Sequence, residues 1–133
     1  MTLTEFLVEA RKNETAWVVA VYRDTLILGK RSDHVNNPGQ WNFFGGHLDS
    51  GESAREAAAR EFREETGFDV PPGSLKKLDV INGASYFICY VSDAAKLRRS
   101  KETAKIRAFK KNELPDELHS KTKAFLDKNG FPA

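Results

Sequence analysis

Residues 46–68 read GHLDSGESAREAAAREFREETGF. This stretch places three carboxylates, Glu61, Glu64 and Glu65, at relative positions i, i+3 and i+4. Residues at this spacing are neighbours on a helix surface, and like charges there destabilise the helix. A divalent cation with oxygen ligands offsets such repulsion. The pattern therefore predicts a metal site on one helix.

The same stretch carries the signals that begin and end a helix. Ser53 and Glu56 have the spacing of a capping box, in which each side chain bonds the other residue's backbone amide. Gly67 suits the left-handed position that follows a helix. We predict a helix over residues 53–66. A solvated Glu- and Arg-rich surface helix is the alternative interpretation, and the complete spacing pattern favours a functional site over it.

The stretch resembles the Nudix box, written G-x5-E-x7-R-E-U-x-E-E-x-G-U, where U is a bulky apolar residue. The fixed positions are filled by Gly46, Glu52, Arg60, Glu61, Phe62, Glu64, Glu65, Gly67 and Phe68. The resemblance implies an α/β fold of the Nudix type, an α/β/α sandwich with a mixed β-sheet. It also implies an enzyme, a metal-dependent pyrophosphohydrolase that cleaves the pyrophosphate linkage of a nucleoside diphosphate joined to another group, X.

The rest of the chain fits such a fold. The length of 133 residues suits one Nudix hydrolase domain spanning residues 1–133. Apolar patterning and turn signals predict further elements. We expect a helix over residues 2–12 and a closing helix over 118–128. Strands are expected at 16–23, 75–81, 84–91 and 105–110, with one more strand beginning at residue 26 and a loop at 31–42. Because strands and helices do not alternate strictly, a mixed sheet with helices on both faces is expected.

The resemblance implies a metal site. The cofactor is expected to be Mg²⁺, with Mn²⁺ as an alternative. Glu64 and Glu65 are expected as its main ligands, together with the carbonyl of Gly45. Glu61 is expected to bind a second metal ion, or to orient and deprotonate the attacking water. The pair Gly45-Gly46 lets a backbone carbonyl approach a metal without an intervening Cβ.

Two further roles follow from the resemblance. Arg60 is expected to pair with Glu52 and neighbouring carboxylates, and so to hold the preceding loop against the helix. Glu52 is also a candidate for reaching a metal through water. Many Nudix enzymes carry another acid just before the last strand, as a base or metal ligand. Here the nearest acid is Glu102 and Lys105 stands at the usual position, so the identity of the base stays open.

Candidate substrate-binding residues lie outside the box. Lys30 and Arg31 end the second predicted strand, where Nudix enzymes often place a phosphate-binding cation; solvated strand-end charges are the alternative. Trp41, Phe43 and Tyr86 are aromatic candidates for stacking on a nucleobase. For Tyr86 the alternative is core packing, because it alternates within an ordinary apolar strand.

The box indicates the reaction class and leaves X open. Tyr86 follows the box at the spacing found in many dinucleoside polyphosphate hydrolases, and the short chain also suits a nucleoside triphosphate pyrophosphatase. A nucleotide-sugar hydrolase of the ADP-ribose or GDP-mannose type is a further alternative. The competing class is a non-catalytic Nudix-fold nucleotide sensor. Such proteins usually lose box glutamates, and all are present here.

Composition bounds the partners and the compartment. The formal charge of +2 predicts no extended nucleic-acid surface. The basic residues at 96–105 suit a solvated face or, alternatively, a polyphosphate or RNA 5′ end. The single cysteine, Cys89, excludes an internal disulfide. No secretory signal or membrane span is visible, which predicts a cytoplasmic enzyme with a small nucleotide substrate.

Two other features stay open at this level. The sequence does not distinguish a monomer from a homodimer. The histidines, His34, His47 and His119, show no metal-ligand spacing, and we interpret them as surface or capping residues.

Overall fold

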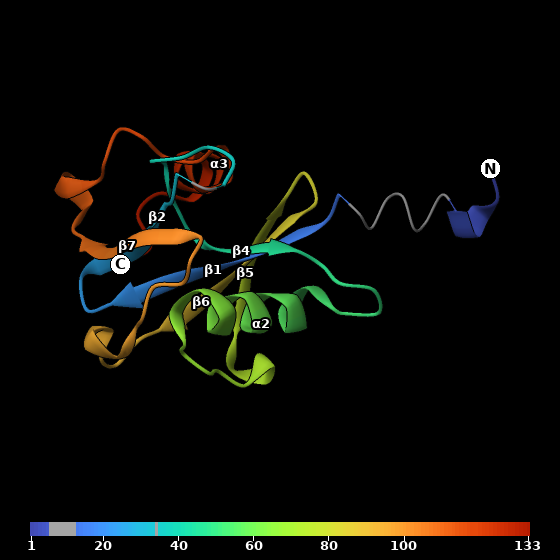
Figure 1. Cartoon of the computed structure of the whole chain (residues 1–133), viewed down its shortest axis with the longest axis horizontal. Coiled ribbons are helices and arrows are strands. Elements are labelled where there is room, and N and C mark those ends of the chain that lie inside the picture. Colours follow the sequence, from blue (N-terminus) through green and yellow to red (C-terminus); the bar gives the residue numbers. More distant parts are fainter. Residues whose placement is uncertain (6–12, 34) are drawn as a thin grey trace.

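The computed structural model describes residues 1–5, 13–33 and 35–133. Within these residues a mixed sheet of seven strands forms the centre of the molecule (Figure 1). The strands are β1 (Thr15–Tyr22), β2 (Thr25–Arg31), β3 (Trp41–Asn42), β4 (Phe44–His47), β5 (Lys76–Ile81), β6 (Ala84–Tyr90) and β7 (Thr103–Phe109). They follow the order β3-β2-β1-β6-β5, while β4 pairs with β1 and β7 with β2. The β1–β6 pair is parallel and the other pairs are antiparallel.

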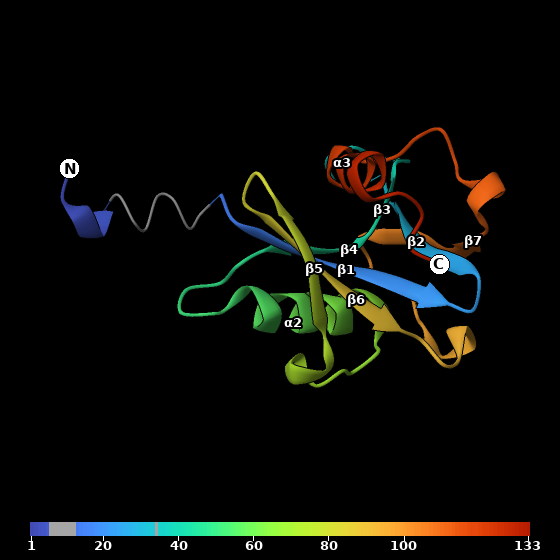
Figure 2. The ribbon, with the colours of Figure 1, turned by 180° about the vertical axis from the view of Figure 1, so that it is seen from behind.

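Two helices cover opposite faces of this sheet, as the two opposed views show (Figures 1 and 2). They are α2 (Ala54–Thr66) and α3 (Ser120–Asn129), and three short 3₁₀ turns, η1 (Pro72–Ser74), η2 (Ala94–Lys96) and η3 (Lys111–Glu113), connect the other elements. The predicted α/β/α sandwich with a mixed sheet is therefore confirmed. In the described part of the chain, no helix is long and apolar enough to cross a membrane.

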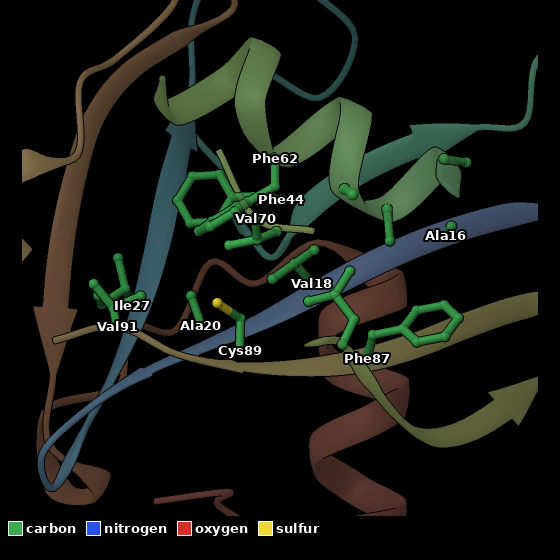
Figure 3. Packing of buried hydrophobic residues seen from close by; sticks show 14 residues of the cluster. Ala16, Val18, Ala20, Ile27, Phe44, Phe62, Val70, Phe87, Cys89 and Val91 are labelled. Atoms are coloured by element: carbon green, nitrogen blue, oxygen red, sulfur yellow. The ribbon is translucent and has the colours of Figure 1, made fainter. Parts of the chain in front are cut away.

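Strand β1 is buried on both faces, which explains its unbroken apolar sequence. Its side chains alternate between two cores, one under α2, which Figure 3 shows, and one under α3. Ala16, Val18 and Ala20 join the α2 core, and Trp17, Val19 and Val21 join the α3 core. The strand thereby holds the two helices in a defined relation to each other.

Helix α2 begins and ends as its sequence predicts. The Ser53 side chain accepts from the Glu56 amide, and the Glu56 side chain accepts from the Ser53 amide. At the other end Gly67 takes a left-handed conformation, with φ of 73°, and its N–H donates to the Arg63 carbonyl. Phe62 is fully buried and packs edge-on against Phe44 at 5.5 Å between ring centroids. One face of α2 is thus anchored, and the opposite face carries the carboxylates.

The boundaries of the last strand differ from the prediction. Strand β7 begins at Thr103, two residues before the expected start, because a bulge between Lys30 and Arg31 shifts the register of its partner β2. Arg31 then pairs with Thr103, whereas Lys30 pairs with Lys105. Glu102 therefore lies directly before the strand, and Lys105 lies within it. Glu102 is thus the acid next to the strand, and its role as base or metal ligand stays a prediction.

Three other predicted elements change in extent. Residues 31–42 are not wholly a loop, since β3 pairs with β2 at its end. The closing helix begins at Ser120 because the side chain of His119 caps it by accepting from the Lys121 amide. The predicted helix at 2–12 lies mostly outside the described residues, although Thr2 and Glu5 exchange both hydrogen bonds of a capping box.

Candidate active site

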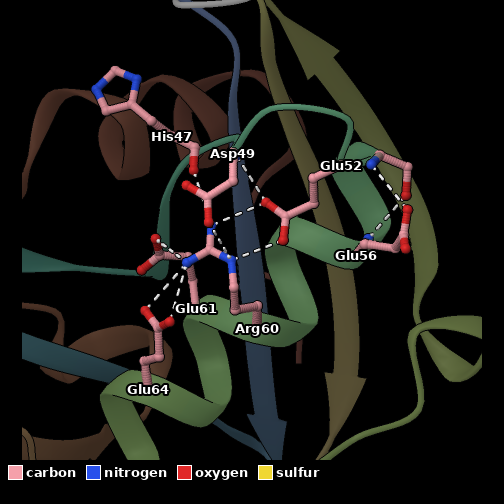
Figure 4. Close-up of polar contacts among 8 residues, drawn as sticks. His47, Asp49, Glu52, Glu56, Arg60, Glu61 and Glu64 are labelled. Carbon is pink, nitrogen blue, oxygen red and sulfur yellow. Dashed lines mark hydrogen bonds and ion pairs between the residues drawn. The ribbon is translucent and has the colours of Figure 1, made fainter.

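Arg60 lies at the centre of an ion-pair network on α2 (Figure 4). It binds Glu52 through two hydrogen bonds, Nε to Oε2 at 2.8 Å and Nη2 to Oε1 at 3.0 Å. Its Nη1 donates to Glu61 at 3.1 Å and to Glu64 at 3.2 Å, and its Nη2 donates to the His47 carbonyl at 3.2 Å. The hydrogen bond to Glu52 raises the pKa of Arg60 further, so this guanidinium stays charged. Arg60 thus ties the loop after β4 to the helix.

Glu61 and Glu65 form a second, more buried cluster. Glu65 Oε1 accepts from the backbone N–H of Gly45 at 3.1 Å. Burial raises the pKa of Glu65 well above its ordinary value, and the charge of Glu61 adds to the effect. Burial also raises the pKa of Glu61, against the opposing charge of Arg60. Two half-buried carboxyls that both resist ionisation are groups that would bind a cation in place of a proton.

A small cavity adjoins Glu65. It measures about 30 Å³, which is sufficient for a water molecule or an ion. Gly45, Glu65 and Glu102 are among the residues that line it. The negative charge of Glu102 also contributes to the raised pKa of Glu65. The oxygen donors around this cavity suit Mg²⁺ or Mn²⁺, so the residues present fit the implied metal.

Glu64 takes part in the Arg60 network and is 53% exposed at its side chain. In the described residues, no three acidic, histidine or cysteine side chains already meet at one point. For Glu64 to join Glu61 and Glu65 around a cation, its carboxylate has to rotate away from Arg60. Such a rotation costs little, because an exposed ion pair contributes at most about 1 kcal/mol.

The two adjacent glycines serve different purposes. A Cβ at Gly45 would lie 2.1 Å from the Ala16 carbonyl oxygen, because β4 packs closely on β1. A Cβ at Gly46 would instead lie 2.9 Å from Glu61 Oε1. The sequence predicts that two glycines stand here so that a backbone carbonyl can approach a metal. The structure shows a strand contact at Gly45 and space for the glutamate at Gly46.

A cleft of about 510 Å³ connects the two faces of the sheet. Its lining includes Arg31, Gly46, Glu61, Glu102, Trp17 and His119. Arg31 is held at the cleft by a hydrogen bond from its Nε to the Asn36 carbonyl at 2.6 Å. Arg31, one of the two cations expected to bind phosphate, therefore lies at the cleft, and its role toward a substrate stays a prediction. Lys30 is absent from the cleft lining within the described residues.

The three aromatic residues expected to stack on a base lie in the α3 core. Trp41, Phe43 and Tyr86 are 8%, 2% and 0% exposed. Phe43 packs edge-on against Tyr86 at 6.0 Å, and the Tyr86 hydroxyl donates to the Lys121 carbonyl at 2.6 Å. Side chains this buried offer no ring face to a ligand, so the stacking interpretation is wrong for this conformation. Core packing, the alternative for Tyr86, is what the structure shows.

Two cleft residues were not assigned to the site from the sequence. Trp17 reads as an ordinary core residue, and His119 as a capping residue. Both interpretations are confirmed, yet both residues also line the cleft. The sequence gives no signal for this second role, because the two residues are far apart in the chain and meet only when α3 packs on β1.

The family model for the NUDIX domain matches residues 12–128. The chain therefore belongs to the Nudix family, and it is a pyrophosphohydrolase by the same evidence.

Solved structures show the same fold. The chain is similar to a MutT NUDIX hydrolase from Burkholderia pseudomallei, with a TM-score of 0.75 and 22% identity over 86% of this chain and 95% of that one. A MutT protein from Methanosarcina mazei Go1 has a TM-score of 0.70 and 20% identity over 86% and 89%. An Ap4A hydrolase from C. elegans, solved as a binary complex, has a TM-score of 0.66 and 19% identity over 86% and 94%.

The two glycines allow a matched pair of alanine substitutions. Gly45→Ala places a methyl group against backbone and should destabilise the protein by roughly 1–3 kcal/mol. Gly46→Ala meets only the end of a flexible carboxylate, so the fold should tolerate it while Glu61 moves. We expect an activity loss of roughly 10- to 100-fold for Gly46→Ala with a nearly unchanged melting temperature. Thermal denaturation and turnover of each variant test this, and equal stability losses would contradict it.

The raised pKa values of Glu61 and Glu65 predict how Mg²⁺ affects stability. Because the folded carboxyls hold protons more tightly than unfolded ones, the metal-free protein should lose stability as pH rises from 4.5 through the raised pKa values. Mg²⁺ binds the ionised form, so its stabilising effect should grow over the same range. Melting temperatures with and without Mg²⁺, at roughly pH 5 and pH 8, measure this. The same shift at both pH values, or an undiminished shift in Glu65→Gln, would contradict the assignment.

Proposed function

We propose that the protein uses Mg²⁺ to hydrolyse nucleoside triphosphates or dinucleoside polyphosphates at a phosphoanhydride bond. The observation that carries this proposal is the half-buried pair Glu61 and Glu65, because Glu61 lines the large cleft, Glu65 lines the small cavity, and Arg31 lines both. The cleft supplies acidic oxygens for a cation and a guanidinium for phosphate. The similarity to an Ap4A hydrolase supports the substrate class, because Ap4A is a dinucleoside polyphosphate.

The side chains have distinct tasks in this proposal. Glu61, Glu64 and Glu65 would hold the metal, with the Gly45 carbonyl as a further donor. A metal bound there would neutralise charge on the phosphates and so lower the barrier for an attacking water. Arg60 acts as a positioning residue, because its hydrogen bonds set the orientation of Glu61 and connect it to the loop through Glu52.

Arg31 binds the substrate. Its guanidinium lies in the cleft lining and presents planar donors that match phosphate oxygens. The hydrogen bond to the Asn36 carbonyl uses Nε and leaves the two terminal nitrogens for other acceptors. When the diphosphate lies between Arg31 and the glutamates, the nucleoside extends along the cleft toward Trp17 and His119, at the start of α3.

Glu102 is the proposed general base. It lines both the small cavity beside Glu65 and the large cleft that contains Glu61. Water attacks phosphorus, the new P–O bond forms as the anhydride P–O bond breaks, and the water proton passes to the Glu102 carboxylate. Glu102 lies directly before β7, next to the register shift at Arg31. It lines the same small cavity as Gly45 and Glu65.

A substrate panel tests the function. Nucleoside triphosphates, dinucleoside polyphosphates and nucleotide sugars are incubated with Mg²⁺ or Mn²⁺, and the products are identified by chromatography. We expect metal-dependent release of nucleoside monophosphate from the first two groups. In Glu64→Gln, turnover should fall by roughly two orders of magnitude or more, because a negative metal ligand is lost.

The matched control is Glu56→Gln, the same substitution on the same helix. Gln also supports a capping box, so α2 should remain intact and turnover near normal. Cleavage of nucleotide sugars alone would reject the proposed substrate class. Binding without any cleavage would instead support a nucleotide sensor.

Glu102→Gln tests the base. Loss of the proton acceptor should lower kcat by roughly 100-fold or more, with the Mg²⁺-induced rise in melting temperature retained. Glu117→Gln, at an exposed position outside the cleft lining, is the control and should leave kcat unchanged. If Glu102→Gln abolishes the Mg²⁺-induced rise, Glu102 is a metal ligand and the base assignment fails.

A further inference from the structure

The segment that leads into the two glycines changes its partner strand at Phe43. Trp41 and Asn42 form β3 and pair with β2, whereas β4 begins at Phe44 and pairs with β1. Phe43 belongs to neither strand, so the ladder is interrupted at this residue. A buried backbone N–H without a partner destabilises a protein. The amide of Phe43, which is 2% exposed, therefore needs an acceptor other than a neighbouring strand.

Thr122 of α3 supplies this acceptor. Its Oγ1 accepts from the Phe43 N–H at 2.9 Å, and the same hydroxyl donates to Oδ1 of Asn42. Thr122 and Asn42 are 0% and 4% exposed, so water is in no position to replace either hydrogen bond. One buried hydroxyl thus holds both residues at the point where the segment passes from one partner strand to the other.

Backbone hydrogen bonds fix Thr122 in this place. The start of α3 lies beside β3 (Figure 2), where the Trp41 N–H donates to the Glu117 carbonyl at 2.8 Å and the Trp41 carbonyl accepts from the His119 N–H at 2.9 Å. The side chain of His119 also caps α3 by accepting from the Lys121 N–H. Because the beginning of the helix is fixed to β3, its third residue, Thr122, faces the junction between β3 and β4.

The junction held by Thr122 forms part of the acidic cavity. Asn42 and Phe43 line this cavity together with Gly45 and Glu65. Gly45 lies two residues beyond Phe43 and donates its N–H to Glu65 Oε1 at 3.1 Å. Few dihedral angles separate Phe43 from Gly45, because planar peptide units leave only two per residue. A displaced Phe43 backbone therefore shifts the Gly45 backbone relative to Glu65.

We propose that Thr122 is a positioning residue for the metal site, because its hydroxyl sets the β3–β4 junction and thereby the place of the Gly45 backbone beside Glu65. The proposal rests on the proposed function, in which Glu65 and the Gly45 carbonyl hold the metal. Within the described residues, Thr122 lines neither the cavity nor the cleft, so it acts through Asn42 and Phe43. Loss of a group that orients a metal site from outside the ligands typically lowers metal affinity or activity by roughly 10- to 100-fold.

The test compares Thr122→Val with Thr122→Ser. Valine keeps the branched shape and removes the hydroxyl, whereas serine keeps the hydroxyl. The Kd for Mn²⁺ without substrate is measured by electron paramagnetic resonance of the free ion. We expect this Kd to rise roughly 10-fold in Thr122→Val and to return close to the native value in Thr122→Ser. The kcat should fall to a similar extent in Thr122→Val, while KM changes less because Arg31 keeps its hydrogen bond to Asn36.

Tyr86→Phe is the matched control. The Tyr86 side chain is fully buried, and its hydroxyl donates to the carbonyl of Lys121, the residue before Thr122. Its loss removes a hydrogen bond between α3 and the sheet without removing either bond at the β3–β4 junction. Tyr86→Phe should therefore lower the melting temperature, while the Mn²⁺ affinity and kcat stay near their native values.

The outcomes separate this inference from the proposed function. If folded Thr122→Val keeps the native Mn²⁺ affinity and kcat, or if Tyr86→Phe loses as much of both, Thr122 has no positioning role and the hydrolase proposal stands. If Thr122→Val does not fold, Thr122→Cys under reducing conditions replaces it, and a native Mn²⁺ affinity in that variant overturns the inference. A native protein that neither binds Mn²⁺ nor cleaves any nucleotide overturns the proposed function itself.

Discussion

The acidic face of α2 depends on the ion pairs that Arg60 makes with its carboxylates. One positive charge serves four carboxylates, because the guanidinium contacts Asp49, Glu52, Glu61 and Glu64. Glu65 receives a backbone N–H from Gly45 instead of a cation, and burial raises its pKa. The charge of this region is therefore incompletely balanced by the protein itself. In the proposed function, a divalent cation would supply the missing positive charge.

Backbone geometry places this unbalanced charge where a substrate can reach it. Strand β4 packs so closely on β1 that a side chain at position 45 would meet the Ala16 carbonyl. The close packing brings the Gly45 N–H to Glu65 and leaves room for Glu61 beside Gly46. The glycines consequently connect the sheet to the acidic helix. Both glycines also line the cleft, which continues past them toward His119 and Lys121 at the start of α3.

The two helices contribute different chemistry to one cleft. Helix α2 provides acidic oxygens on a rigid, well-capped element, whereas the start of α3 provides His119 with its ring fixed by Lys121. Strand β1 holds both helices, since alternate side chains pack under each. Residues from two separate elements thus line one cleft, while the sheet fixes their relation to each other.

Local sequence determined α2, its caps, the Arg60 and glutamate spacing and the alternation in β1, because these depend on neighbours within a few residues. Tertiary structure decided the rest of the site. The bulge at Arg31 placed Glu102 before β7, and sheet packing buried Tyr86 although its sequence position suits a ligand contact equally well. His119 entered the cleft only through the docking of α3. These outcomes depend on contacts between segments distant in the chain, which no local pattern encodes.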